Sequence, residues 1–146
     1  MKYLKLLLLT AFLVGCDWGT ESYQAVMNIA QSWAEAYFNC DYHDAEQYIT
    51  TESQKWLRFA ASNTTEQDLQ LLQAHDVTIE TTDDTVCNDT LHVVTLQVSN
   101  YLAPTALGDS VAIASQGVFQ VTVVKRDGQW QVRMEGLPRS EKQSRD

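Results

Sequence analysis

An α+β fold is the class that this sequence predicts, with helices first and a meander of antiparallel strands after them. Apolar residues recur at helical spacing between residues 21 and 39. β-branched segments of alternating polarity follow residue 76, and an Asp-Gly pair at 127–128 joins the last two of them. Helical and extended segments that are separated along the chain pack as separate layers, which is typical of α+β domains.

The first 15 residues, MKYLKLLLLTAFLVG, have the plan of a secretory signal peptide, with a basic start and a short apolar stretch. That stretch is shorter than the ~20 residues that a membrane-spanning helix needs. Its end, Leu-Val-Gly-Cys at 13–16, resembles the lipobox of bacterial lipoproteins. The resemblance implies cleavage after Gly15 and diacylglycerol on the sulfur of Cys16. An ordinary signal peptide with a chance cysteine is the alternative.

A lipidated Cys16 would anchor the protein to a membrane of the cell envelope, with the domain facing the periplasm or the cell surface. Two or more acyl chains, such as palmitate, hold a protein stably, whereas one chain holds it reversibly. Asp17 resembles the inner-membrane retention signal of enteric-type lipoproteins. The rule differs between phyla, so the choice between inner and outer membrane stays open.

The charge of the chain argues against nucleic acid as a partner. The whole chain has 10 basic and 19 acidic residues, and two of the basic ones lie in the segment 1–15, which holds no acid. The remaining chain therefore has a formal charge of −11. An acidic domain is repelled by nucleic acid and by anionic headgroups.

The chain without residues 1–15 is long enough for a single domain with a real core. We expect residues 16–22 to form the lipidated cysteine and a tether, and residues 23–138 to form the domain. Residues 139–146 are polar throughout and predict a disordered tail.

Four helices are expected in the first half of the domain. The longest covers residues 21–39 and is amphipathic. A short second helix is expected over residues 42–49. Thr51-Glu-Ser-Gln54 and Thr64-Thr-Glu-Gln67 each have the form of a capping box, and they predict a third and a short fourth helix. The apolar stripe of the long helix consists of Tyr23, Val26, Met27, Ala30, Trp33, Ala34, Tyr37 and Phe38.

Strands are expected over residues 77–81, 91–102 and 111–125, with a bend or a bulge at Gly117. Asp127-Gly128 is the preferred type I′ hairpin turn and predicts a fourth strand. With this turn one face of the hairpin is apolar and the other is mostly polar, and a one-residue slip would mix them. The inward face is then formed by Phe119, Val121, Val123, Trp130, Val132 and Met134.

Cys40 and Cys87 remain once Cys16 is assigned to lipid. An exported location permits disulfides, so the sequence favours a Cys40–Cys87 bridge. It would close a loop of about 47 residues and stabilise the fold by about 4 kcal/mol in the chain-entropy model. Two buried thiols are the alternative. Cys40-Asp-Tyr-His43 has the form of half a metal site without a matching second half, so no metal and no cofactor are expected.

Two stretches carry a resemblance to the NTF2-like, cystatin-like fold. The first is IAQSWAEAYFNCDYHDAEQYITTESQKWL at 29–57, and the second is 123–132, with Gly128 and Trp130 in the dG-x-W positions usual in that family. Together with the lipobox, the chain resembles small NTF2-like lipoproteins of the Bacteroidota. The resemblance implies a curved sheet that wraps the long helix and leaves an apolar pocket at the mouth of a cone. It covers most of the mature chain, but its motifs carry no chemistry.

Three functions are open for such a cone. Enzymes of this fold, such as ketosteroid isomerases and polyketide cyclases, place an Asp or His inside the pocket, where burial adjusts its pKa. The inward face of the last hairpin offers no acid or base, so we expect no catalysis; an isomerase, cyclase or dehydratase is the alternative. The remaining titratable candidates lie at element ends, where solvated turn chemistry is ordinary: Asp41, His43, Asp44, His75, Asp76 and His92.

The second function is binding of a small apolar or amphipathic ligand, because aromatic side chains supply large contact areas with polar edges. The same aromatics could instead fill the core: Trp33, Tyr37, Trp56, Phe59 and Trp130. The third function is assembly, in which the outer face of the sheet contacts a protein partner or a second copy in a homodimer. That face is expected to carry Thr95, Gln97, Thr122 and Arg133.

Three tripeptides match the Asp-Ser/Thr-apolar form that resembles the O-glycosylation acceptor of exported Bacteroidota proteins. Their acceptor residues are Thr85, Thr90 and Ser110, all expected in loops or at strand starts. A glycan at any of them requires surface exposure.

Overall fold

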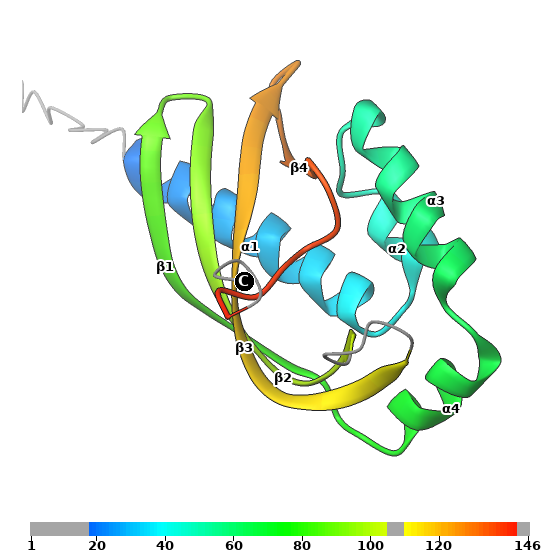
Figure 1. The fold of residues 1–146 in the computed structure, drawn as a ribbon. Helices are drawn as coiled ribbons and strands as arrows, with labels where there is room; N and C mark the ends of the chain where they lie inside the picture. The colour runs from blue at the N-terminus through cyan, green and yellow to red at the C-terminus, as the bar shows by residue number, and fades with distance from the viewer. Residues whose placement is uncertain (1–17, 105–109, 143–146) are drawn as a thin grey trace, which may run out of the picture.

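A computed structural model describes residues 18–104 and 110–142, so the expected signal peptide and Cys16 lie outside the described residues. Helix α1 (Trp18–Phe38) lies against one face of a four-stranded antiparallel sheet of order β1-β2-β3-β4 (Figure 1). The strands are β1 (Thr78–Asn88), β2 (Leu91–Pro104), β3 (Val111–Arg126) and β4 (Gln129–Arg133). The expected α+β fold is confirmed. None of the described helices is long and apolar enough to cross a membrane.

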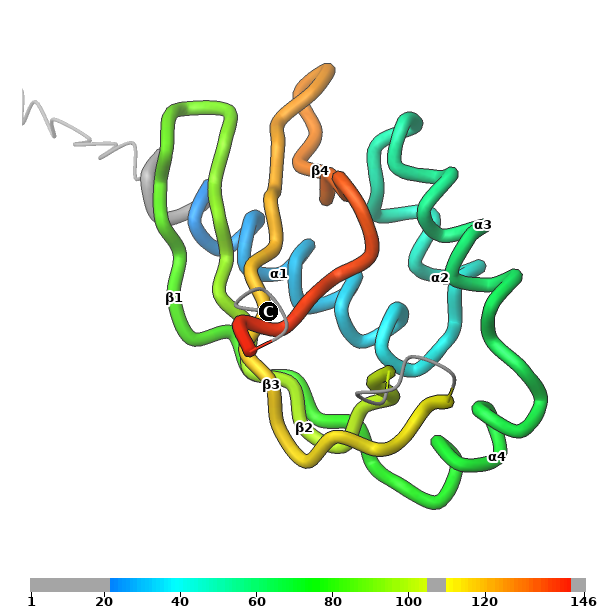
Figure 2. The backbone as a smooth tube through the Cα atoms, in the orientation of Figure 1, coloured from blue at the N-terminus to red at the C-terminus, as the bar shows by residue number. Residues whose placement is uncertain are grey.

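The other helices form a separate arm beside the open edge of the sheet, which Figure 2 shows as a continuous backbone path. They are α2 (Tyr42–Glu46), the 3-10 helix η1 (Thr51–Ser53), α3 (Gln54–Asn63) and α4 (Glu66–Gln73). The arm is joined to the sheet by a parallel bridge between Ile49 and Val132. The Thr50 amide donates to the Val132 carbonyl oxygen at 3.0 Å, and the Val132 amide donates to the Tyr48 carbonyl oxygen at 2.8 Å.

The core lies between α1 and the concave face of the sheet. The expected stripe of α1 supplies Val26, Ala30 and Ala34, each with no exposed surface. The sheet supplies Val94, Leu96 and Val98 of β2 and the inward face of the last hairpin, as expected.

Helix α1 begins at Trp18, so the tether predicted over residues 16–22 is wrong from residue 18 onward.

The last hairpin has the predicted register. Thr122 pairs with Arg133 and Val123 pairs with Val132. Asp127 and Gly128 have φ angles of 51° and 76°, as a type I′ turn requires. The sequence alone was sufficient to predict this hairpin, because the turn residues and the polarity of its two faces indicate the same register.

Strands β2 and β3 are long and bend together, so that their far ends curve toward α4 (Figure 1). Pairing continues without a register shift from Val98–Gly117 to Tyr101–Ala114, so there is no bulge at Gly117. The glycine is needed for space: a Cβ there would lie 2.3 Å from the Tyr101 hydroxyl oxygen.

The two capping predictions have different outcomes. The box expected at Thr51–Gln54 does not form: Ser53 precedes α3, and its hydroxyl accepts from the Met134 amide at 2.8 Å and lies 2.6 Å from the Thr50 hydroxyl. The fourth helix does begin with a capping box, one residue later than expected, at Thr65 and Asp68.

The tail is ordered further than expected. The Glu141 amide donates to the Val118 carbonyl oxygen of β3 at 3.0 Å, and Ser140 is buried. The segment after β4 therefore leaves the sheet and returns to it. The prediction of disorder is wrong for residues 139–142, and residues 143–146 lie outside the described ones.

The expected Cys40–Cys87 bridge does not form, and both thiols are free. Cys40 follows the C-terminal end of α1, whereas Cys87 is near the end of β1, beside the start of that helix (Figure 1). A helix of 21 residues is about 30 Å long, and a disulfide requires Cα atoms within about 7 Å.

Candidate ligand cavity

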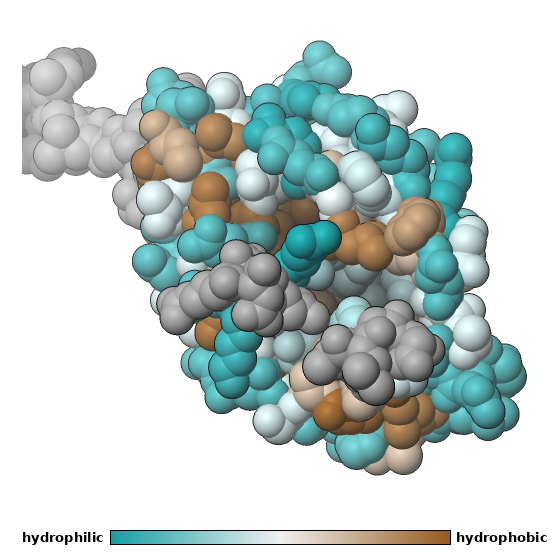
Figure 3. Space-filling model, viewed as in Figure 1, coloured by the Kyte–Doolittle hydropathy of each residue, from teal (hydrophilic) through white to brown (hydrophobic). Residues whose placement is uncertain are grey.

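A cavity of about 1030 Å³ opens where the sheet bends away from α1. Its wall comes from the end of α1, from α3, from β2 and β3, and from the segment after β4. Figure 3 shows the hollow on this face of the molecule, with apolar side chains at its rim. The volume is that of a site for a small organic ligand.

Four of the five aromatic residues expected in a pocket line this cavity: Trp33, Tyr37, Trp56 and Phe59. Trp33 is 2% exposed and stacks on Tyr37, with ring centroids 5.1 Å apart. Phe59 is 52% exposed, which is unusual for a phenylalanine on an amphipathic helix. The aromatic residues therefore differ in burial: Trp33 belongs to the core as well as to the cavity wall, whereas Phe59 lines the cavity and is not part of the core.

Trp130 is not part of the cavity, contrary to expectation. It packs at the other end of the sheet, edge-on to His92, with ring centroids 4.9 Å apart. The ammonium group of Lys125, its cross-strand partner, lies 5.7 Å from the Trp130 ring centroid.

A chain of polar side chains lies on the α1 side of the cavity. The Tyr42 hydroxyl is 3.5 Å from the Cys40 sulfur and 2.9 Å from the Thr64 hydroxyl. The Thr64 hydroxyl also lies 2.8 Å from the Ala60 carbonyl oxygen, to which it donates near the end of α3. Thr64 therefore ends α3 and fixes Tyr42, instead of beginning the fourth helix as expected.

The Cys40 thiol and the phenol hydroxyls of Tyr37 and Tyr42 keep their protons. Burial raises the pKa of the Cys40 thiol, and burial is also the main reason that the pKa values of Tyr37 and Tyr42 are raised. Cys40 has a φ angle of 60°, a left-handed conformation that is uncommon for a residue with a side chain. A protonated thiol is a poor nucleophile, so this cluster suits hydrogen bonding better than covalent chemistry.

None of the six titratable candidates lines the cavity. Asp41 caps α2 by accepting from the Asp44 amide at 3.2 Å, and the Gln47 amide nitrogen donates to Asp44. His43, His75 and Asp76 are exposed. The cavity wall instead holds titratable side chains that the sequence interpretation did not place there, among them Cys40, Asp68 and Glu135.

His92, the sixth candidate, is not solvated as expected. It is 5% exposed and faces α1, and its Nδ1 lies 2.9 Å from an Asp84 carboxylate oxygen. The Asp84 side chain is itself fully buried. A signal was available: His92 has the same strand parity as Val94 and Leu96, which face inward. The pair does not line the cavity.

Within residues 18–104 and 110–142, no three His, Cys, Asp or Glu side chains come together in a way that could hold a metal ion. The three glycan acceptors, Thr85, Thr90 and Ser110, are exposed. Thr85 lies inside β1 and not in a loop, because that strand extends seven residues beyond its predicted end at residue 81.

Two residues expected on the outer face of the sheet, Thr122 and Arg133, are part of the cavity wall. The reason is the path of the chain after β4, which leaves the sheet and returns to β3 (Figure 2). Thr95 and Gln97 are half-buried on β2 and do not line the cavity.

Solved structures that are similar to this chain include two proteins of unknown function. An NTF-2 like protein of unknown function from Shewanella oneidensis MR-1 has a TM-score of 0.51 and 13% identity, covering 76% of this chain and 93% of that one. A protein of unknown function from Mycobacterium tuberculosis has a TM-score of 0.53 and 16% identity, covering 86% of this chain and 75% of that one. No family model and no curated protein matches the sequence. The likeness shows the NTF2-like fold and nothing about activity.

Proposed function

We propose that this protein is a lipid-anchored protein of the cell envelope that binds a small apolar or amphipathic molecule in its cone without converting it. One observation carries the proposal: the cavity of about 1030 Å³ has an exposed Phe59 at its opening and a buried Trp33 in its wall. An apolar side chain left exposed beside an apolar cavity is typical of a binding site.

The polar groups of the cavity support binding over catalysis. Cys40, Tyr37 and Tyr42 keep their protons because their pKa values are raised. The carboxylate of Asp68 accepts from the Thr65 amide at 2.8 Å and so fixes the start of α4. A general base must be able to give up and take a proton near the working pH, and the raised pKa values of Cys40, Tyr37 and Tyr42 do not suit that role.

The test of binding uses N-phenyl-1-naphthylamine, a neutral apolar probe whose fluorescence rises in an apolar site. The chain from residue 16 to residue 146 with C16S contains every described element and carries no lipid. We expect saturable binding that is weakened severalfold by Phe59→Ala. Tyr23→Ala is the matched control, because Tyr23 is 43% exposed on α1 and does not line the cavity. Equal loss in both variants, or no saturable binding, would contradict the proposal.

The anchor is tested separately, because it rests on residues 13–16 alone. Intact mass of the full-length protein from its native membranes should show loss of residues 1–15 and addition of acyl chains at Cys16. The variant C16S should carry no acyl mass, because the sulfur that would be acylated is absent. A native protein that keeps residues 1–15, or that shows no acyl mass at Cys16, would contradict lipid anchoring.

A further inference from the structure

We infer that the ligand of this cavity is an amphipathic carboxylate, whose acid group accepts hydrogen bonds from Arg133 while its apolar body lies among the aromatic side chains. The inference rests on the proposed function and adds the chemical class of the ligand. It begins with the side-chain polar atoms that are buried without a hydrogen-bond partner in the described part of the chain. There are two, the indole Nε1 of Trp33 and the guanidinium Nε of Arg133.

Both atoms are hydrogen-bond donors, and both residues line the cavity. Buried polar groups in folded proteins nearly always have a partner, and a donor without an acceptor destabilises the fold. No side-chain acceptor is in the same condition among the described residues. The cavity therefore lacks acceptors and not donors, so a ligand that suits it supplies acceptor oxygens.

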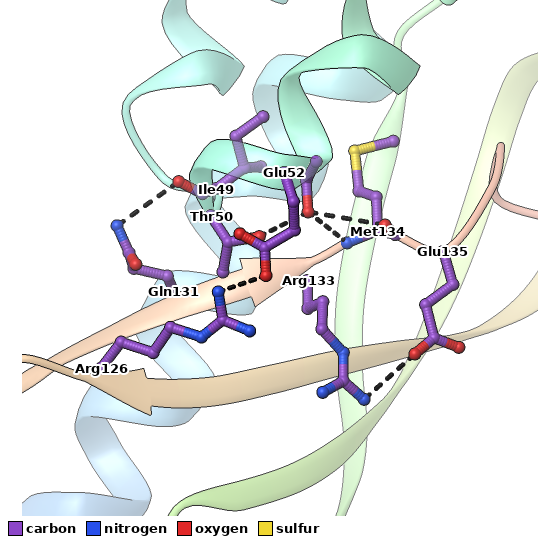
Figure 4. Close-up of polar contacts among 9 residues, drawn as sticks. Ile49, Thr50, Glu52, Arg126, Gln131, Arg133, Met134 and Glu135 are labelled. Atoms are coloured by element: carbon purple, nitrogen blue, oxygen red, sulfur yellow. Dashed lines mark hydrogen bonds and ion pairs between the residues drawn. The ribbon is translucent and has the colours of Figure 1, made fainter.

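The positive charge of Arg133 favours a negatively charged acceptor group on the ligand. Figure 4 shows its guanidinium beside Glu135, just beyond β4, where Nη2 lies 3.1 Å from a carboxylate oxygen. The Glu135 side chain is 74% exposed, so water weakens this pair. A planar guanidinium binds a carboxylate through two parallel N–H groups. A ligand carboxylate that binds Nε and one Nη of Arg133 gives the buried Nε its missing acceptor. Its only competitor in the structure for the guanidinium is the solvated carboxylate of Glu135.

The described charged residues of the cavity wall are balanced in number, with Arg133 and Arg139 against Asp68 and Glu135. Arg126 is already paired with Glu52 and does not line the cavity (Figure 4). Asp68 does line it, and one of its carboxylate oxygens accepts from the Thr65 amide at the start of α4. Arg139 is exposed and lines the cavity as a second cation.

Binding requires a movement of Arg133, because neither unpartnered nitrogen touches solvent in the structure. The Arg133 side chain is 32% exposed and its ion-pair partner is solvated, so the guanidinium can rotate at small cost. Trp33 is fixed by its stacking on Tyr37. We therefore assign the acid group to Arg133 and a secondary contact to Trp33.

The experiment compares dodecanoic acid with 1-dodecanol, which have the same chain but differ in charge. Each displaces N-phenyl-1-naphthylamine from the C16S chain of residues 16–146 at neutral pH. We expect the acid to bind about tenfold more tightly than the alcohol, the size of one charge-assisted hydrogen-bond pair. Arg133→Gln should abolish the preference, and Arg133→Lys should keep part of it because the charge remains without the bidentate geometry.

Arg58→Gln is the matched control, because Arg58 is an exposed arginine that does not line the cavity. It should leave the preference unchanged. Equal affinity for acid and alcohol, or a preference that survives Arg133→Gln, would overturn the inference while the binding function stands. If the neutral probe itself does not bind, both the carboxylate inference and the proposed binding function are contradicted. Thermal unfolding of each variant confirms that the fold is retained.

Discussion

The two ends of the sheet hold different kinds of polar side chain. At the cavity end, a thiol and two phenols keep their protons beside Trp33. At the other end, near the turn between β1 and β2, His92 is paired with Asp84 under the ring of Trp130. A buried imidazole and carboxylate are the usual groups of acid–base catalysis, but here they lie apart from the cavity. The separation favours a protein that holds a molecule over one that converts it.

The largest expected effect contrasts the two tryptophans. Trp33 is 2% exposed and contacts the core from α1, so Trp33→Ala should destabilise the fold by about 3–5 kcal/mol. Trp130 is half-buried near the hairpin end, so Trp130→Ala should destabilise it by about 1–2 kcal/mol, in proportion to its smaller buried area. Urea unfolding followed by circular dichroism measures both. A larger loss for Trp130→Ala would mean that the hairpin end, and not the cavity wall, determines stability.

The second effect concerns the pair at the hairpin end. Asp84→Ala leaves the His92 imidazole buried without its partner, which should destabilise the fold by about 1–3 kcal/mol. Glu80→Ala is the control, because Glu80 is an exposed acid of the same strand. Probe binding in the cavity should be unchanged in both variants. Impaired binding in Asp84→Ala would connect the two ends and reopen the enzyme alternative.

The third effect belongs to the cavity end and depends on pH. In the unfolded chain the Cys40 thiol has its ordinary pKa of 9.0, whereas burial raises its pKa in the fold, as it does for Tyr37 and Tyr42. The stability from these groups is therefore fully present below pH 9 and is lost as the pH rises above it. We expect a loss of about 1–2 kcal/mol between pH 8 and pH 10.5. Urea midpoints across this range measure it.

Cys40→Ser tests the cause of that loss, because a serine hydroxyl does not ionise in this range. The variant should lose less stability than the wild type on going from pH 8 to pH 10.5. An equal slope in both proteins would assign the alkaline loss to groups elsewhere in the chain.

The sequence predicted those parts of the fold that depend on local patterns. The stripe on α1 and the Asp127-Gly128 turn each follow from neighbours within one element, and both are confirmed. The Asp84–His92 pair was missed because β1 was expected to end at residue 81, since the sequence TTDDTVCN has no clear alternation. Strand pairing with β2 overrides this weak local pattern.

The candidate site was less predictable than the fold, because its wall depends on contacts between distant segments. Trp130 was assigned to the cavity and Arg133 to the outer face, and the structure places each differently. The error at Arg133 comes from the chain after β4, which leaves the sheet and returns at Val118, whereas Trp130 packs on His92 at the other end of the sheet. No spacing or composition in residues 134–142 indicates this return.

The smallest expected effect tests the capping boxes, where local and tertiary hydrogen bonds compete. Thr65→Ala removes the side chain that accepts from the Asp68 amide at 3.2 Å, so it should destabilise the fold by about 1 kcal/mol. Thr51→Ala should be near neutral, because Thr51 is exposed and the start of α3 is fixed by Ser53 on the Met134 amide. Thermal unfolding distinguishes the two. If Thr51→Ala destabilised the fold as much as Thr65→Ala, the Thr51 side chain would stabilise the start of α3 in addition to Ser53.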